Sequence, residues 1–154
     1  TFGSEVSTSG RLMPQYFLQK AGIKTKDFAG GRAGFSGSHD VTIALVQSGA
    51  YEAGALNELV WKSNVKEQKV DKSKVKVIWR TPTYADYHWL AQPNLNEEFG
   101  DGFTNKLKNT LLSLNRNSPR HKIILELFGA TKFIPANPED YNNIEKIGRQ
   151  LGKI

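Results

Sequence analysis

Three hydroxyl side chains follow one another near the beginning of the chain, just before an apolar pattern of helical spacing. They are Ser7, Thr8 and Ser9, and Gly10 follows them. The first turn of a helix leaves backbone N–H groups without intrahelical partners, and the helix dipole favours negative charge there. Such an end can hold a small tetrahedral oxyanion. Serine and threonine are also the usual N-caps, so a cap without a ligand is the alternative interpretation.

A second polar group precedes the next apolar helical pattern, in residues 40–48. It consists of Ser36, Ser38, His39 and Asp40. In a parallel α/β sheet the helix N-termini lie along the edge where the strands end, and ligands bind at that edge. We therefore expect the two polar groups to converge, with the His39 imidazole as a further donor to an anion. A locally hydrogen-bonded cap is the alternative for His39.

Carboxylates at such a site would select a ligand by its protonation. Asp86 stands beside Tyr87 in a stretch rich in proline and aromatic residues. It would accept a hydrogen bond from a ligand that carries a proton or an amine, and it would repel a fully deprotonated anion. A turn cap is the alternative for Asp86. Asn57 and Glu58 end another apolar run, and the same two interpretations apply to them.

The sequence gives no support for covalent or cofactor chemistry. The residue types of a nucleophilic triad are present in Ser9, His39 and Asp86. The sequence has no nucleophile elbow, however, and a serine that caps a helix is not activated. Phosphate-loop, zinc-ligand and dinucleotide motifs are absent, and the chain contains no cysteine. We therefore expect a binding protein without metal or cofactor rather than an enzyme.

Composition and charge indicate a folded, basic protein. The 154 residues are 38% hydrophobic, enough for a buried core, and they contain no apolar run long enough to span a bilayer. The formal net charge of +6 favours anionic partners. Much of the excess lies in residues 62–76, where no aromatic side chains stand between the lysines to stack on bases. A solvated basic surface is therefore favoured over a nucleic-acid site.

Apolar periodicity predicts the elements that position these residues. The elements predicted in the first part are helices at about residues 10–21, 40–48 and 58–68 and a strand at residues 75–79. This alternation indicates an α/β layer around a mainly parallel sheet. Pro14 has no N–H to donate to the Gly10 carbonyl, so the first turn of the first helix is expected to be loosened.

The second half is predicted to be helical, after a crossing segment with prolines and aromatics. Helices are expected at residues 96–114, 119–127 and 138–151. No strand accompanies them, so their apolar faces need a sheet or a partner outside this sequence. The apolar residues concerned are Leu107, Leu111, Ile123, Leu127, Ile144 and Ile147.

Three segments together resemble one known family. They are TFGSEVSTSGRLMPQYFL, FSGSHDVTIALVQSGAYEAGALNELVW and VIWRTPTYADYHW, in this order and spacing. They are similar to the substrate-binding proteins of phosphonate and phosphite ABC importers. The resemblance runs from Phe2 to about Trp89, and the remaining helices agree in kind without a diagnostic motif.

The resemblance implies a type II periplasmic-binding-protein fold, in which two α/β lobes close on a ligand and each lobe has three layers around a mixed sheet. Residues 1–80 would form the second lobe, residues 81–93 the hinge, and residues 94–154 helices that complete the first lobe. On this interpretation the N-terminal part of the first lobe is absent from this sequence. That missing segment of the same protein would pack against the present chain as its partner.

The resemblance also implies a ligand site and a function. The residues matched to the family's site are Ser7, Thr8 and Ser9 as the cradle of the phosphorus oxygens, His39 as a donor, Asp86 with Tyr87 at the hinge, and Glu58 for a ligand amine. The protein would bind phosphonate or phosphite outside the cytoplasm, in the periplasm or at the membrane, and deliver it to a permease. A sulfonate or a thiamine precursor is the alternative ligand.

Overall fold

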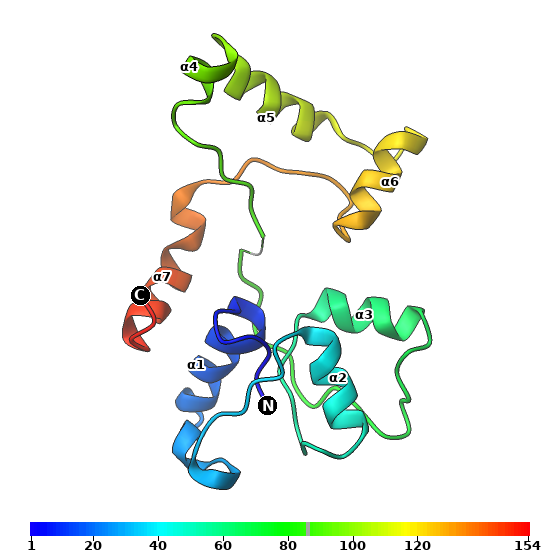
Figure 1. The fold of residues 1–154 in the computed structure, drawn as a ribbon, viewed down its shortest axis with the longest axis vertical. Helices are drawn as coiled ribbons and strands as arrows, with labels where there is room; N and C mark the ends of the chain where they lie inside the picture. Colours follow the sequence, from blue (N-terminus) through cyan, green and yellow to red (C-terminus); the bar gives the residue numbers. More distant parts are fainter. Residues whose placement is uncertain (86) are drawn as a thin grey trace. The chain divides into compact units, whose positions relative to one another are not determined.

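The computed structural model describes residues 1–85 and 87–154, in which short helices are joined by irregular segments (Figure 1). The chain forms two compact units. The first comprises Thr1–Tyr84 and Tyr141–Ile154, and the second comprises Ala85–Asp140. None of the described helices combines the length and the apolar character that crossing a membrane requires.

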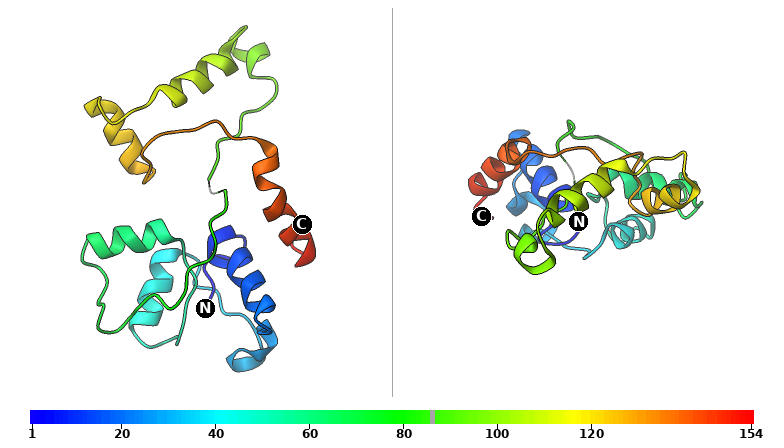
Figure 2. Two further views of the ribbon diagram at one scale, coloured as in Figure 1. Left: turned by 180° about the vertical axis from the view of Figure 1, so that it is seen from behind. Right: turned by 90° about the horizontal axis from the view of Figure 1, so that it is seen from above.

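The first unit carries the helices whose ends hold the predicted site residues. Its helices are α1 (Met13–Lys20), α2 (His39–Gln47), α3 (Glu58–Lys66) and α7 (Asn142–Gln150), with a π-helical turn η1 (Thr8–Leu12) and the 3₁₀ turns η2 (Thr25–Asp27) and η3 (Ala29–Gly31). The helices predicted in the first part of the chain are thus confirmed. Helices α2 and α3 lie side by side (Figure 2), and Asn64 Nδ2 on α3 donates to Asp40 Oδ1 on α2 across 2.8 Å.

Pro14 explains the irregular start of α1. In the π-helical turn Thr8–Leu12, an N–H donates to the carbonyl of Ser7, five residues earlier, across 2.9 Å. Because Pro14 has no N–H to offer the Gly10 carbonyl, that carbonyl accepts from the Gly3 N–H instead, at 2.8 Å. The expected loosening of the first turn is confirmed. The hydrogen bond from the Gly3 N–H to the Gly10 carbonyl holds the N-terminal segment against the start of the helix.

The N-terminal segment also makes the β-pairing found among the described residues. Phe2 forms an isolated parallel bridge with Phe35 and is 2% exposed. The strand predicted at residues 75–79 is not formed in the described structure, so the expected mixed sheet is not confirmed. A strand needs a neighbour that bonds its N–H and C=O groups. The apolar alternation of residues 75–79 does not predict where in the sequence the neighbouring strand lies.

The second unit is helical, as predicted, but its first helix is broken. Its helices are α4 (Leu95–Phe99), α5 (Phe103–Ser113) and α6 (Pro119–Leu127). The 3₁₀ turn η4 (Pro138–Tyr141) follows, and at its last residue, Tyr141, the chain re-enters the first unit. The prediction of one helix over residues 96–114 is wrong, because Gly100 and Gly102 adopt positive φ angles of 96° and 79° between α4 and α5. The helix predicted at residues 119–127 is confirmed.

Helix α6 is only partly covered by the rest of its unit. Leu125 is 0% exposed, whereas Ile123 and Leu127 are 62% and 80% exposed. Nearby, Phe128 packs edge-on against Phe133, with ring centroids 5.8 Å apart. The apolar face of α6 therefore lacks a complete partner within the described part of the chain, as the sequence predicts.

The last helix, unlike α6, has its apolar face covered within the described chain. The pattern predicted over residues 138–151 divides into η4 and α7, and α7 packs against α1 and η1 in the first unit. Ile147 is 1% exposed there, so the expectation that its face needs a partner outside this sequence is wrong for Ile147. The assignment of residues 1–80, 81–93 and 94–154 to a lobe, a hinge and another lobe stays a prediction.

Candidate functional site

The first hydroxyl group lies at the start of a helix, as predicted. Ser7 has the extended φ and ψ of an N-cap, and its Oγ accepts from the Gly10 N–H across 2.9 Å. Capping is thus the structural role of Ser7. Thr8 and Ser9 follow in the first turn, where backbone N–H groups have no intrahelical acceptor, and both are half-buried.

Asn57 joins this helix start to two others. Asn57 is the N-cap of α3, and its Oδ1 accepts from the Leu59 N–H at 2.8 Å. Its Nδ2 donates to Ser9 Oγ at 3.4 Å, and its backbone N–H donates to His39 Nδ1 at 3.3 Å. His39 is the first residue of α2. The starts of η1, α2 and α3 therefore meet at one place, and Ser9 and His39 are brought together there.

The hydrogen bond from Asn57 also defines the chemistry of the imidazole. Because Nδ1 of His39 accepts the Asn57 N–H, the neutral ring carries its own proton on Nε2. In this tautomer the ring donates through Nε2 at the start of a helix. Ser38 supplies the N-cap of α2, since its Oγ accepts from the Val41 N–H at 3.3 Å.

Two glycines let the imidazole lie directly against the first helix. A Cβ on Gly10 would lie 3.1 Å from His39 Cε1 and 3.2 Å from the Cα of Gly3. A Cβ on Gly3 would lie 3.3 Å from the Cα of Gly10. Both approaches are tighter than side chains normally tolerate, so the convergence of the helix starts depends on these glycines. Sequence reasoning identified Gly10 as part of a helix start but did not single out Gly3.

Glu58 is placed next to this junction but is engaged elsewhere. Its Oε1 lies 3.1 Å from Lys62 Nζ and 3.0 Å from Arg80 Nε, and its side chain is 48% exposed. Hydrogen bonds from Lys62, and then from Arg80, lower the pKa of Glu58 below its usual 4.5. Glu58 is therefore ionised at neutral pH, with two cations as its partners.

The predicted carboxylate of the crossing segment lies outside the described residues, since Asp86 is the one position that the structure leaves undescribed. Tyr87, beside it, belongs to the second unit and is 77% exposed.

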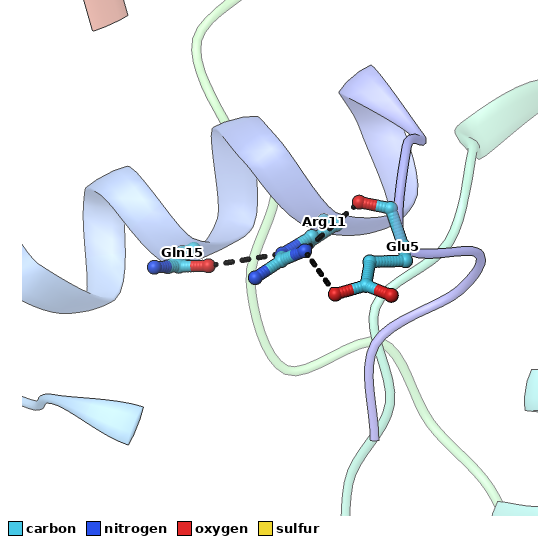
Figure 3. Close-up of polar contacts among 3 residues, drawn as sticks. All are labelled: Glu5, Arg11 and Gln15. Atoms are coloured by element: carbon cyan, nitrogen blue, oxygen red, sulfur yellow. Dashed lines mark hydrogen bonds and ion pairs between the residues drawn. The ribbon is translucent and has the colours of Figure 1, made fainter. Parts of the chain in front are cut away.

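A buried arginine ties the loop before the hydroxyls to the helix after them (Figure 3). Arg11 is 7% exposed, and its Nη1 donates to the Glu5 carbonyl at 3.0 Å, while its Nε donates to Gln15 Oε1 at 3.2 Å. The Glu5 carboxylate lies 3.4 Å from Nη1, and the guanidinium lies 4.7 Å from the centre of the Phe35 ring. Sequence reasoning missed Arg11, although the spacing of Arg11 and Gln15 on one helix face is the signal that could have found it.

Replacing Arg11 by Met is expected to lower the free energy of unfolding of the full-length protein by about 1–3 kcal/mol. The physical reason is that the buried Gln15 side chain and the Glu5 carbonyl lose their donor. Urea unfolding measures the change. The matched control is Arg149→Met, because the ion pair of Arg149 with Glu145 is exposed and should contribute at most about 0.5 kcal/mol. Equal effects of the two substitutions would contradict the structural role of Arg11.

The comparison with protein families gives one match over most of the chain. A family model described as "ABC transporter, phosphonate, periplasmic substrate-binding protein" matches residues 1–141.

Individual relatives agree with this match. The chain is 56% identical, over 154 residues, to a probable ABC transporter phosphite binding protein PhnD1 from Prochlorococcus marinus (strain MIT 9301), and it covers 52% of that protein. Its fold matches the solved structure of PhnD1 from Prochlorococcus marinus (MIT 9301) in complex with methylphosphonate, with a TM-score of 0.95 and 56% identity. This match covers 100% of the present chain and 57% of the other. The chain thus spans about half the length of these relatives.

Proposed function

This chain belongs to the family of periplasmic substrate-binding proteins of phosphonate ABC transporters, and from this membership we propose that the protein binds a phosphonate or phosphite and delivers it to a membrane permease. Its place of action would be outside the cytoplasm, as for the family. The observation that carries the proposal is the junction of three helix starts, at which Asn57 holds Ser9 and His39 together.

Neutral donors would hold the oxyanion at this junction. Thr8 and Ser9 offer hydroxyls and first-turn N–H groups, and His39 offers Nε2–H, so the charge of the ligand is met by hydrogen bonds and helix dipoles. Hydrogen bonds to an ionised group are about twice as strong as those between neutral groups. No bond of the ligand has to break for this task, and we propose a carrier rather than an enzyme.

We propose that carboxylate side chains decide which anion binds. Asp86, with Tyr87 beside it, is proposed to accept from a P–OH group, and fully deprotonated phosphate would be repelled. Glu58 is proposed as a contact for a ligand amine. Its ion pairs with Lys62 and Arg80 are exposed, and exposed pairs contribute little, so an amine could replace them.

The rest of the two-lobed fold is also part of the proposal. The exposed apolar face of α6 and the greater length of the relatives support a sheet contributed by residues outside this sequence. With that sheet, residues 1–80 would form one lobe of a type II binding protein, with α7 packed on it, residues 94–140 would complete the other lobe, and residues 81–93 would form the hinge. Closure of the lobes would exclude water from the ligand.

Calorimetric titration of the full-length protein tests this function. The ligands are phosphite, methylphosphonate, 2-aminoethylphosphonate, phosphate and sulfate, and a sulfonate completes the panel. We expect a Kd at or below about 1 μM for at least one of the first three, and much weaker binding of phosphate and sulfate. Tight sulfonate binding would contradict the role of the ligand proton. Weaker binding of 2-aminoethylphosphonate than of methylphosphonate would contradict the role of Glu58.

A further inference from the structure

The Asn57 side chain is used at both of its ends. Its Oδ1 accepts from the Leu59 N–H and so caps α3, while its Nδ2 donates to Ser9 Oγ. The residue is 5% exposed, although its side chain is polar. Capping accounts for the oxygen alone. The amide nitrogen therefore needs a separate explanation, and it donates to the hydroxyl of a residue proposed to hold the oxyanion.

The direction of the hydrogen bond to Ser9 matters for an anion site. A serine hydroxyl has one proton and two lone pairs. When Asn57 Nδ2 donates to Ser9 Oγ, it occupies a lone pair of that oxygen and leaves the Ser9 proton free to be donated elsewhere. A residue that accepted from Ser9 would have the opposite effect, since it would take the proton that an anion requires.

This distinction separates Asn from Asp at position 57. Both residues are good N-caps, because each has an oxygen for the first-turn N–H groups. An aspartate, however, could not donate to Ser9 Oγ, and it would place a negative charge next to the hydroxyl. If capping were the only role of Asn57, the two residues would be equivalent.

We propose that Asn57 is a positioning residue of the anion site: its Nδ2 holds the Ser9 hydroxyl so that the hydroxyl donates to the phosphorus oxyanion. This inference rests on the proposed function, since it needs an oxyanion at Ser9. It goes further by assigning a role to a side chain that does not itself contact the ligand.

Two substitutions in the full-length protein test the proposal, with methylphosphonate as the probe. Near neutral pH, Asn57→Asp is expected to weaken binding on the order of 100-fold, because a carboxylate next to the Ser9 hydroxyl repels the anion, and like charges a few ångströms apart interact strongly at an effective dielectric constant of about 20. Asn57→Ser keeps a capping oxygen and adds no charge, but its side chain is too short to reach Ser9. It is expected to weaken binding about threefold to tenfold, as the loss of one neutral hydrogen bond would.

The pH dependence supplies a readout that a purely structural role would not change. The measured quantity is the ratio of the Kd of each variant to that of the parent, so that titration of the ligand itself cancels. For Asn57→Asp the ratio should fall toward the Asn57→Ser value as the pH approaches about 4, where an ordinary aspartate takes up its proton. For Asn57→Ser the ratio should stay constant. Thermal unfolding of both variants should stay close to that of the parent.

Each outcome decides the proposal. Ratios near one for both variants at every pH would show that Asn57 acts only as a cap and would overturn it. A pH-independent loss in Asn57→Asp together with a lower unfolding temperature would show structural damage and would overturn it as well. If the parent binds methylphosphonate, these results concern Asn57 alone. If the parent binds neither a phosphonate nor phosphite, the proposed function is wrong, and this inference is wrong with it.

Discussion

In the full-length protein, substitution of both Thr8 and Ser9 by alanine is expected to weaken methylphosphonate binding by on the order of 100-fold or more, because each hydrogen bond to a charged group contributes about 1.5–3 kcal/mol. The first-turn N–H groups would remain, so some affinity should persist. Ser7, which caps the helix start, is unchanged in this variant. The Ser9 substitution also removes an acceptor of the buried Asn57 Nδ2, so a loss of about 1–3 kcal/mol in the free energy of unfolding is expected beside the loss of affinity. Calorimetric titration and urea unfolding of the same preparation measure the two effects separately.

A matched control is available in the second unit. Ser118 stands at the N-cap position of α6, but its side chain makes no capping hydrogen bond. Ser118→Ala should bind methylphosphonate as the parent does. Parent-like affinity of the Thr8 and Ser9 double variant would mean that these hydroxyls do not hold the anion.

The second large effect is expected for Gly10→Val, which should weaken methylphosphonate binding on the order of 100-fold and lower the free energy of unfolding by about 1–3 kcal/mol. The Cβ alone would lie 3.0 Å from Ser7 Oγ, 3.1 Å from His39 Cε1 and 3.2 Å from Gly3 Cα. The Gly3 backbone is held by its hydrogen bond to the Gly10 carbonyl, so the imidazole has to move. Titration and urea unfolding of the same preparation measure the two effects.

Ala44→Val also introduces a valine into a helix, at an exposed position of α2, and serves as the control. It should leave affinity unchanged and cost only the small helix preference of alanine over valine, about 0.5 kcal/mol. Unchanged affinity of Gly10→Val would contradict the close packing of His39 against the first helix as a condition for binding.

The local elements of the fold could be predicted because their causes are local. Apolar spacing identified α2, α3 and α6, and the missing N–H of Pro14 identified the irregular first turn. The break between α4 and α5 was missed, although its signal was present. Phe99 and Phe103 keep helical spacing across Gly100 and Gly102, so the apolar pattern predicts one continuous helix, whereas the positive φ angles of the two glycines divide it.

The sheet could not be predicted from local pattern. A strand is stabilised by hydrogen bonds to another segment, which can be distant in the sequence. Residues 75–79 alternate as a strand does, but no neighbour pairs with them among the described residues. The packing of α7 was missed for the same reason, because its contacts with α1 join segments far apart in the chain.

The candidate site divides in the same way. The Ser7, Thr8 and Ser9 hydroxyls and His39 could be predicted because helix starts have recognisable residue types. Their convergence was expected from a sheet that is not present among the described residues. What joins them in the structure is Asn57, together with the close approach of Gly3 and Gly10. The contacts of Asn57 with Ser9 and His39, and of Gly10 with His39, join segments far apart in the sequence, and residue types alone could not give them.

A crystal structure of the full-length protein with methylphosphonate is the most direct test of the central claim. The account predicts phosphonate oxygens within about 3.2 Å of donors on Thr8, Ser9 and His39, at the junction of the three helix starts. It also predicts that Asn57 Nδ2 stays on Ser9 Oγ in the complex. A phosphonate bound elsewhere, with Thr8, Ser9 and His39 free of it, would contradict the account.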